Sequence, residues 1–344
     1  MNRRMVILIV TAILLPVSFC VSISVGAASV PVLETIRILC GYDSESRFLY
    51  IIRDIRLPQA LAAVLAGAGL SVSGATMQSV LRNPLCSPFT LGISSAAAFG
   101  AAATLYLSGG EISLADNMLL GSSRFFVTGR GGIALGAFFC AVTTTGVVLL
   151  LGQVRGTRSE SIILVGVALS SLFSAALMFL QYIADDSRLA AIVYWTFGDT
   201  ARANWNSLIL MAVCVLPVSL YFLYQSWNYN VLVLGEESAR SLGVPVRRLQ
   251  ILTMLFASLL TAVLVSLLGI IGFVGLVVPH VARLWVGSDH RFLLPFSLLF
   301  GGLLLLIADT SARLIFAPRI LPVSILTAFI GVPVFLSLLL SKRN

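Results

Sequence analysis

Long apolar stretches, separated by short segments that hold most of the charged residues, occupy most of this chain. As an α-helix, about 20 consecutive apolar residues cross the roughly 30 Å hydrocarbon core of a bilayer. Long continuous runs favour such helices over the short alternating strands of a membrane barrel. Only 10% of the residues are charged, whereas soluble domains contain roughly 25%. The sequence therefore predicts an all-α polytopic membrane protein and excludes a soluble globule.

We expect about ten membrane-spanning helices in a single transmembrane domain over residues 1–344. The first follows Arg3 and Arg4 and so resembles a secretory signal. Its apolar run, however, is longer than the roughly 7–15 residues of a signal core. We expect a retained helix, with cleavage after the small residues at 26–28 as the alternative. The predicted helices lie near residues 5–27, 58–80, 91–107, 131–152, 161–183, 206–225, 250–269, 273–287, 293–315 and 322–340.

Basic residues give the predicted orientation, because short loops on the inner side of a membrane are enriched in arginine and lysine. With the N-terminus inside, 12 of the 22 basic residues fall on the inner side, whereas only four of the 14 acids do. We therefore predict that both termini lie inside (N-in, C-in). The inner basic residues are Arg3, Arg4, Arg82, Arg155, Arg158, Arg240, Arg247, Arg248, Arg283, Arg291, Lys342 and Arg343.

Small residues recur at helical spacing in the second predicted helix, where Gly67 and Ser71 are four apart and Gly74 follows. In lipid such residues let helix backbones approach closely. We expect tight packing around this helix, with direct contact to a translocation pathway as the alternative. Three glycines at 269–275, among them Gly272 and Gly275, predict a break, because glycine is unfavourable inside a helix. Such a break must be buried in protein or face water, so it is either a structural turn or part of a pathway.

The residues that the chain lacks exclude several functions. Its single lysine, Lys342, follows no glycine-rich phosphate loop, so the chain is not its own P-loop ATPase. Nothing resembles a nucleophile elbow, and the five scattered cysteines have no metal-ligand spacing. We therefore expect no catalytic residue, metal, cofactor or nucleic-acid partner. Asp309 with Arg313 and His280 with Arg283 keep an ion-coupled carrier as an alternative, although neither pair is predicted at the membrane midplane.

The longest predicted inner connection, residues 226–250, contains a short charged helix. Glycines bracket it, two glutamates open its first turn and an arginine lies in a later turn, an order of charges that suits the helix dipole. Ala239 and Leu242, three apart, give it a small apolar face of the kind that a groove on a partner accepts. An ordinary solvated loop helix is the alternative. The candidate docking residues are Gly235, Glu236, Glu237, Ser238, Ala239, Arg240, Leu242 and Gly243.

Short motifs spread over almost the whole chain, in one order, carry a family resemblance. They are Arg56-Leu57-Pro58, Arg82-Asn83-Pro84-Leu85, Leu91-Gly92-Ile93-Ser94-Ser95, Gly235 to Gly243, Gly272-Phe273-Val274-Gly275, Asp289-His290-Arg291, Ala308-Asp309 with Ala312-Arg313, and Leu321-Pro322-Val323-Ser324. Together they resemble the iron-siderophore, cobalamin and haem permease family of ABC importers (FecCD-type transmembrane subunits). The resemblance implies ten helices per subunit, a homodimer or paralogous heterodimer, and a pathway along the dimer axis.

The resemblance also implies partners and a location. These are two cytoplasmic ATP-binding subunits, an extracytoplasmic solute-binding protein and the inner membrane of a bacterium or archaeon. In this family the loop that matches Glu236 to Gly243 docks on the ATPase. A ferric siderophore is the expected substrate because it is the commonest in the family, with haem and cobalamin as alternatives.

Family permeases also use outward-facing arginines to meet carboxylates of the binding protein. The matching positions are Arg56 and Arg313, with the alternative that Arg313 only neutralises Asp309. Two positions depart from the family pattern. Gln59 stands where a second arginine often follows, and Ile270 stands where the glycine turn usually contains a proline.

Overall fold

The computed structural model of the protein describes residues 3–26, 30–39, 41, 46–108, 130–154, 159–315, 317 and 319–341. Within these ranges all ten predicted membrane segments are helices. Arg155, Arg158, Lys342 and Arg343, which support the predicted orientation, lie outside the described residues. The ten helices are α1 (Arg3–Ser24), α4 (Leu57–Val80), α5 (Ile93–Leu107), α7 (Arg130–Val154), α8 (Ser159–Ile183), α10 (Trp205–Tyr224), α13 (Val246–Leu268), α14 (Val274–Val286), α15 (His290–Ile315) and α16 (Val323–Ser341).

Helix length separates these ten segments into two groups. Seven are long and apolar enough to cross a membrane, whereas the described parts of α5, α14 and α16 form shorter apolar helices. The second span begins earlier than predicted, because helical backbone runs without a break from Phe48 to Val80. Its first part comprises α3 (Ser46–Tyr50) and the π-helical η1 (Ile51–Arg56).

The long connections at residues 28–57 and 184–205 contain helices that no predicted span covers. The first contains α2 (Val32–Leu39) in addition to α3 and η1, and the second contains α9 (Asp186–Thr196) and the short η2 (Thr200–Arg202). Local capping accounts for α9, because the Asp185 side chain accepts a hydrogen bond from the backbone N–H of Arg188 at 2.9 Å.

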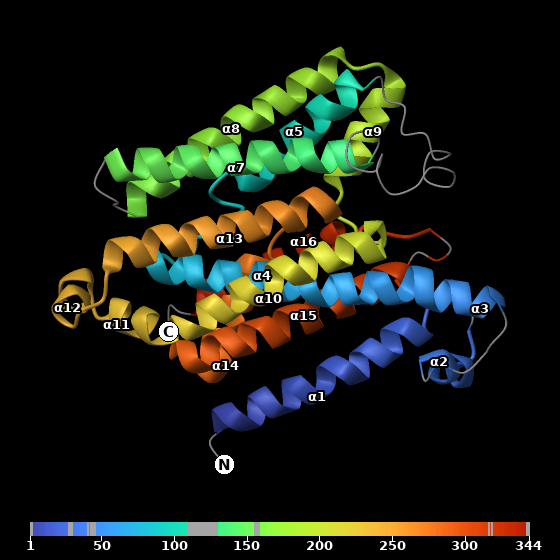
Figure 1. Cartoon of the computed structure of the whole chain (residues 1–344), viewed down its shortest axis with the longest axis horizontal. Coiled ribbons are helices and arrows are strands. Elements are labelled where there is room, and N and C mark those ends of the chain that lie inside the picture. Colours follow the sequence, from blue (N-terminus) through green and yellow to red (C-terminus); the bar gives the residue numbers. More distant parts are fainter. Residues whose placement is uncertain are drawn as a thin grey trace.

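Helix α4 forms the centre of the bundle. It packs against α1, α10, α13, α14 and α15, and its most apolar stretch is 83% buried. Figure 1 shows a second group above it, in which α5, α7, α8 and α9 pack together and α13 joins them to the centre. Most of the surface of α8 is exposed, since only 11% of its most apolar 18-residue stretch is buried inside the chain.

Glycine pairs set the closest helix approaches, as the small-residue pattern predicted. A Cβ added at Gly67 would overlap the Gly301 carbonyl of α15, and one at Gly74 would overlap the Gly275 carbonyl of α14. Ser71 lies between these contacts and donates a hydrogen bond to the Ser297 carbonyl at 2.6 Å. At these positions α4 packs closely against α14 and α15.

The predicted break after α13 is also present. Gly269 has φ +82° and Phe273 has φ +66°, and the residues between them are not helical. The carbonyl of Leu268 accepts a hydrogen bond from the backbone N–H of Asp199 at 2.8 Å, and Ile270 pairs with Phe197 in a bridge. The freed backbone is thus bonded to the segment that follows α9, so the structural reading accounts for this turn.

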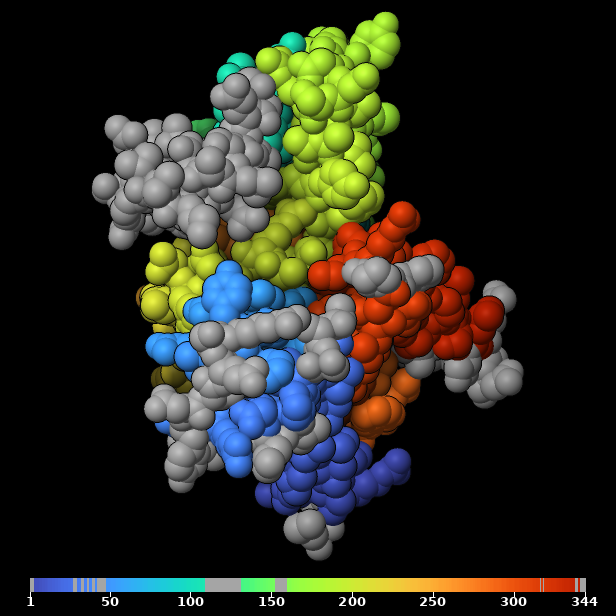
Figure 2. Space-filling view, turned by 90° about the vertical axis from the view of Figure 1, so that its right-hand side faces the viewer, coloured from blue at the N-terminus to red at the C-terminus, as the bar shows by residue number. Residues whose placement is uncertain are grey.

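The two ends of the bundle differ in their short elements. Helices α11 (Ser226–Val233) and α12 (Glu236–Ser241) lie at one end, and α2 and α3 lie at the other (Figure 1). Helix α1 begins and α16 ends at the α12 end (Figure 1). Figure 2 looks along the bundle from the opposite end and shows α16 in red projecting on one side and α10 in yellow on the other.

Candidate functional site

The predicted docking helix is α12, and its glycines are required by backbone geometry. Gly235 has φ +115° and Gly243 has φ +82°, conformations that side chains disfavour, although a Cβ at either position would meet no atom within 4 Å. The backbone N–H of Val244 donates to the Ala239 carbonyl at 2.9 Å and closes the helix end. These contacts present α12 as a separate, defined helix between two spans.

One expectation for α12 is wrong, because Ala239 does not share an exposed face with Leu242. Ala239 is fully buried within the chain, whereas Leu242 is 65% exposed. The helix closure after Ala239 turns that residue inward. The exposed apolar surface is instead formed by Val233, Leu234 and Leu242.

The two glutamates of α12 differ in their contacts: Glu236 is bonded to neighbouring side chains, and Glu237 is exposed. Glu236 pairs with Arg240 at 3.3 Å and accepts a hydrogen bond from the Gln250 amide of α13 at 3.1 Å. Glu237 and Ser238 are exposed on the outside of the helix. The geometry therefore fixes α12 to α13 on one side and leaves Glu237 accessible on the other.

Helix α11 ties this end to the spans through side chains that the sequence analysis did not single out. The Asn230 Oδ1 accepts hydrogen bonds from the backbone N–H of His290 at 2.8 Å and lies 2.8 Å from its Nδ1. The other ring nitrogen of His290 lies 2.6 Å from the Ser79 hydroxyl of α4. The Tyr229 hydroxyl contacts Thr253 of α13 at 2.8 Å. We call Ser79, Asn230, Asp289 and His290 the inner network.

Asp289 connects the inner network to the surface. Its Oδ1 accepts a hydrogen bond from the Asn230 amide at 2.8 Å, and its carboxylate pairs with Arg291 at 3.0 Å. The hydrogen bonds from Arg291, with a further one from Asn230, lower the pKa of Asp289 to about 2. Asp289 is therefore ionised at neutral pH. The only sequence signal for this network was the Asp289-His290-Arg291 motif, since its partners Ser79 and Asn230 belong to no predicted pattern.

Arg56 and Arg313, expected to be exposed at the opposite end, are instead buried, with exposures of 4% and 6%. Arg56 donates to the carbonyls of Ile23 and Ser24 at 2.9 and 3.0 Å. Arg313 donates to the Ser22 carbonyl at 3.2 Å and to the Ser22 hydroxyl at 2.7 Å. The last carbonyls of a helix lack intrahelical donors, so both arginines complete the end of α1. Their docking to a binding protein stays a prediction.

Asp309 is the anionic centre of this second cluster. It pairs with Arg313 at 3.1 Å, as the alternative reading of these residues proposed. It also accepts hydrogen bonds from the Gln59 amide at 2.9 Å and from the Thr200 hydroxyl. We call Ser22, Arg56, Gln59, Thr200, Asp309 and Arg313 the outer network. Its Oδ2 lies in the ion pair with Arg313 but accepts no hydrogen bond within the described residues. This pairing with a fixed positive charge makes Asp309 a poor candidate for the proton-carrying group of an ion-coupled transporter.

The predicted pathway residues fall into two sets. Gly67, Ser71, Gly74 and Gly275 lie in helix contacts inside the chain. Gly272 is at the break, where an added Cβ would lie 4.0 Å from the Phe89 ring. Gly275 also lines a small cavity of about 20 Å³ beside Phe89 and Phe273. The place of these residues on a translocation pathway stays a prediction. Exposed apolar residues lie on α8 and α16, where Leu172, Phe179 and Phe329 are 60–75% exposed, and also on α1 and α10.

The fold and this loop arrangement define a membrane permease of the ABC transporter type. A solved metal-chelate type ABC transporter in an inward-facing conformation is similar over 97% of this chain and 99% of its own, with a TM-score of 0.82 and 33% identity. An ABC transporter permease protein of Methanocaldococcus jannaschii is 48% identical over 98% of this chain and 95% of the relative. The hemin transport system permease protein HmuU of Yersinia pestis is 36% identical over 94% of this chain and 93% of the relative.

The FecCD transport family model matches residues 14–341. The chain belongs to this family. It is a multi-pass permease subunit of an ABC importer, and the family resemblance that its motifs carry is confirmed.

Proposed function

We propose that this permease imports a ferric siderophore across the cytoplasmic membrane, driven by two separate ATP-binding subunits. The α12 end faces the cytoplasm in this proposal, in agreement with the positive-inside distribution of the basic residues. The observation that carries it is α12 itself, a defined charged helix between two spans, in a chain of the FecCD family.

The ATPase docks on α12 and its flanking residues. Glu237 and Leu242 are accessible to a partner, while Glu236, through its bond to Gln250, fixes the helix to α13. Movement of the docked ATPase displaces α12 and tilts the spans, which alternates access to a central cavity. The permease itself makes and breaks no bond.

A second permease copy completes the pathway. The open apolar surfaces of α8 and α16 are where a second copy packs, and the pathway runs between the two copies. An extracytoplasmic binding protein delivers the substrate to the opposite end. Specificity lies largely in that protein, and the ferric chelate is favoured by the likeness to a metal-chelate type transporter.

Uptake by whole cells tests the substrate. Radiolabelled ferric siderophore, haem and cobalamin are supplied in parallel to iron-starved cells with and without the chain. We expect loss of the ferric signal alone, restored by the intact chain. Loss of haem or cobalamin uptake instead would show that this compound is the substrate, and the proposed importer architecture would still hold. Uptake that persists without an ATP-binding subunit would identify an ion-coupled carrier.

A further inference from the structure

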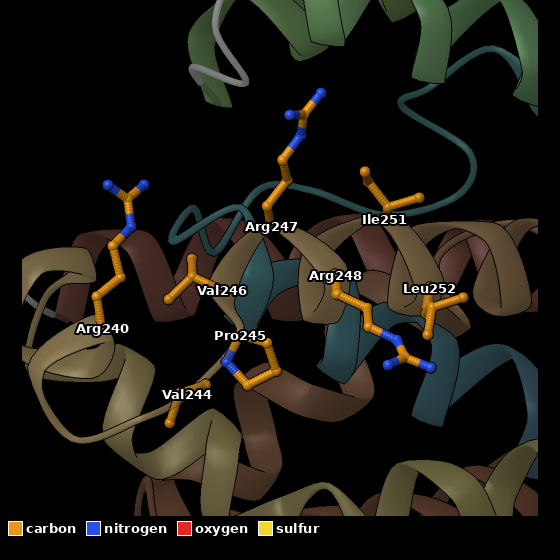
Figure 3. Close-up of a pocket in the computed structure, with 8 residues that line it drawn as sticks. All are labelled: Arg240, Val244, Pro245, Val246, Arg247, Arg248, Ile251 and Leu252. Carbon is orange, nitrogen blue, oxygen red and sulfur yellow. The ribbon is translucent and has the colours of Figure 1, made fainter.

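A groove of about 550 Å³ lies at the α12 end, where the docking segment enters α13. Its apolar wall is formed by Val244, Ile251 and Leu252, and three arginines surround it: Arg240, Arg247 and Arg248. Figure 3 shows Arg240 and Arg247 extending in the same direction, toward α7, while Arg248 extends along α13 beside Leu252. The groove is therefore apolar in its wall and basic at its rim.

These arginines are not neutralised evenly. Arg240 pairs with Glu236, but no hydrogen bond or ion pair is recorded between Arg247 or Arg248 and any residue that the structure describes. The first turn of α13 contains no acid. Two adjacent positive charges at a helix N-terminus are unfavourable beside the helix dipole, so an anion from outside the chain would stabilise this corner.

The position of the groove fits the headgroup level of a bilayer. Arg247 and Arg248 lie in the first turn of a membrane span, with Ile251 and Leu252 one turn deeper. Tyr224, the last residue of the adjacent span α10, and Trp227 in α11 are exposed. Aromatic residues of this kind mark membrane–water interfaces.

An exposed apolar face of the chain also lies beside α13. Helix α10 packs beside α13, and its outer face is apolar, with Val213, Leu216 and Leu220 58–65% exposed. This face lies away from α16, as Figures 1 and 2 both show. A second permease copy packed on α8 and α16 would leave it to the membrane.

We infer that this groove binds the headgroup of an anionic phospholipid, with Arg247 and Arg248 contacting the phosphate. Guanidinium groups pair well with phosphate oxygens, and the apolar wall receives the upper part of an acyl chain. Arg240 belongs both to this groove and to the candidate docking residues, whereas Arg247 and Arg248 belong to the groove alone. Their role can therefore be tested on the permease without the ATPase.

The test is lipid binding to the purified full-length chain in neutral detergent. Phosphatidylglycerol or phosphatidylcholine is titrated, and bound lipid is counted by native mass spectrometry. We expect phosphatidylglycerol to bind preferentially and an R247A/R248A variant to bind it at least about tenfold more weakly. An R3A/R4A variant, which removes two arginines from the same end, serves as the matched control and retains binding.

An R247K/R248K variant retains the charges and is expected to keep most of the phosphatidylglycerol preference. This outcome separates loss of charge from loss of folding. Equal binding by R247A/R248A and the control would overturn the proposal. So would displacement of the lipid by millimolar inorganic phosphate, which would indicate a free-anion site, or loss of ATPase co-purification with lipid binding intact, which would assign the arginines to the protein interface.

Discussion

The inner and outer networks lie at opposite ends of the same central helices, and they differ in what they connect. The outer network joins α1, α4, η2 and α15 through a buried ion pair, so its members are all parts of the bundle itself. The inner network joins α11, which leads into α12, to the starts and ends of spans through neutral side chains and one surface ion pair. One network fastens spans to each other, and the other fastens a surface segment to the spans.

This difference indicates two mechanical roles. Breaking a buried ion pair is costly because it leaves a charge without a partner, so the outer network holds its elements in one arrangement. Hydrogen bonds between neutral groups cost less to rearrange. The inner network can therefore pass a displacement of α12 to α4 and α15 while the outer ends of the same helices stay together.

The largest expected effect comes from Asp309→Ala. It leaves Arg313 buried without its counter-charge and removes the acceptor of Gln59 and Thr200. We expect a loss of about 3–5 kcal/mol in stability, measured as thermal inactivation in detergent and as yield of folded protein. Arg37→Ala, which removes an exposed ion pair with Glu34, is the control and changes little. Equal stability of both variants would contradict an anchoring role.

An intermediate effect is expected for the inner network. Asn230→Ala removes the acceptor for His290 and the donor to Asp289, and we expect a loss of about 1–3 kcal/mol. The variant should still co-purify with its ATPase but import less substrate per ATP hydrolysed. Reduced ATPase binding with normal coupling would instead assign Asn230 to the docking surface.

A double-mutant cycle sharpens the same comparison. Asn230→Ala combined with His290→Ala should show an interaction energy of about 0.5–3 kcal/mol, because the two side chains are in contact. Asn230→Ala combined with Asp309→Ala should be additive within about 0.5 kcal/mol, since the two residues lie in separate networks. A large interaction energy between Asn230 and Asp309 would show that the two networks are coupled, which would contradict their separation.

The smallest effect is expected for Asp289→Asn, because its partner Arg291 is 47% exposed and the pair is screened by water. The pKa of Asp289 is lowered to about 2 in the folded chain, against about 4 in an unfolded one. Its contribution is therefore present above pH 4 and is lost as the pH falls toward 2. We expect a fall in melting temperature of no more than about 2 °C at pH 7, and almost none well below pH 2, where the carboxyl is protonated in both states.

Most of the fold could be predicted from the sequence because the membrane restricts a chain to few solutions. Every predicted span is a helix, and the small residues at Gly67 and Gly74 mark the closest approaches of α4. The short helices α2 and α9 were missed because they have no long apolar run. Helix α9 depends on a local cap by Asp185 that resembles ordinary loop composition.

The site was predicted in part. The glycines at 235 and 243 fix α12 through their backbone conformation, which the sequence shows directly. The burial of Arg56 and Arg313 was not foreseeable from local pattern, because their acceptors are carbonyls of α1, which is distant in sequence. Asn230 was missed for a related reason. Its partners, His290 and Asp289, lie about 60 residues further along the chain.

The central claim is that α12 transmits the movement of the ATPase to the membrane spans. Its most direct test measures two things: co-purification of the ATPase, and ATP-driven uptake in reconstituted vesicles. Gly243→Pro cannot keep the φ of +82° that closes α12, and Glu237→Lys reverses an accessible charge there. We predict that both variants insert normally but lose ATPase binding and uptake, whereas Asp186→Lys, an acid in the first turn of α9 at the other end, keeps ATPase binding. Normal uptake by the α12 variants would contradict the account.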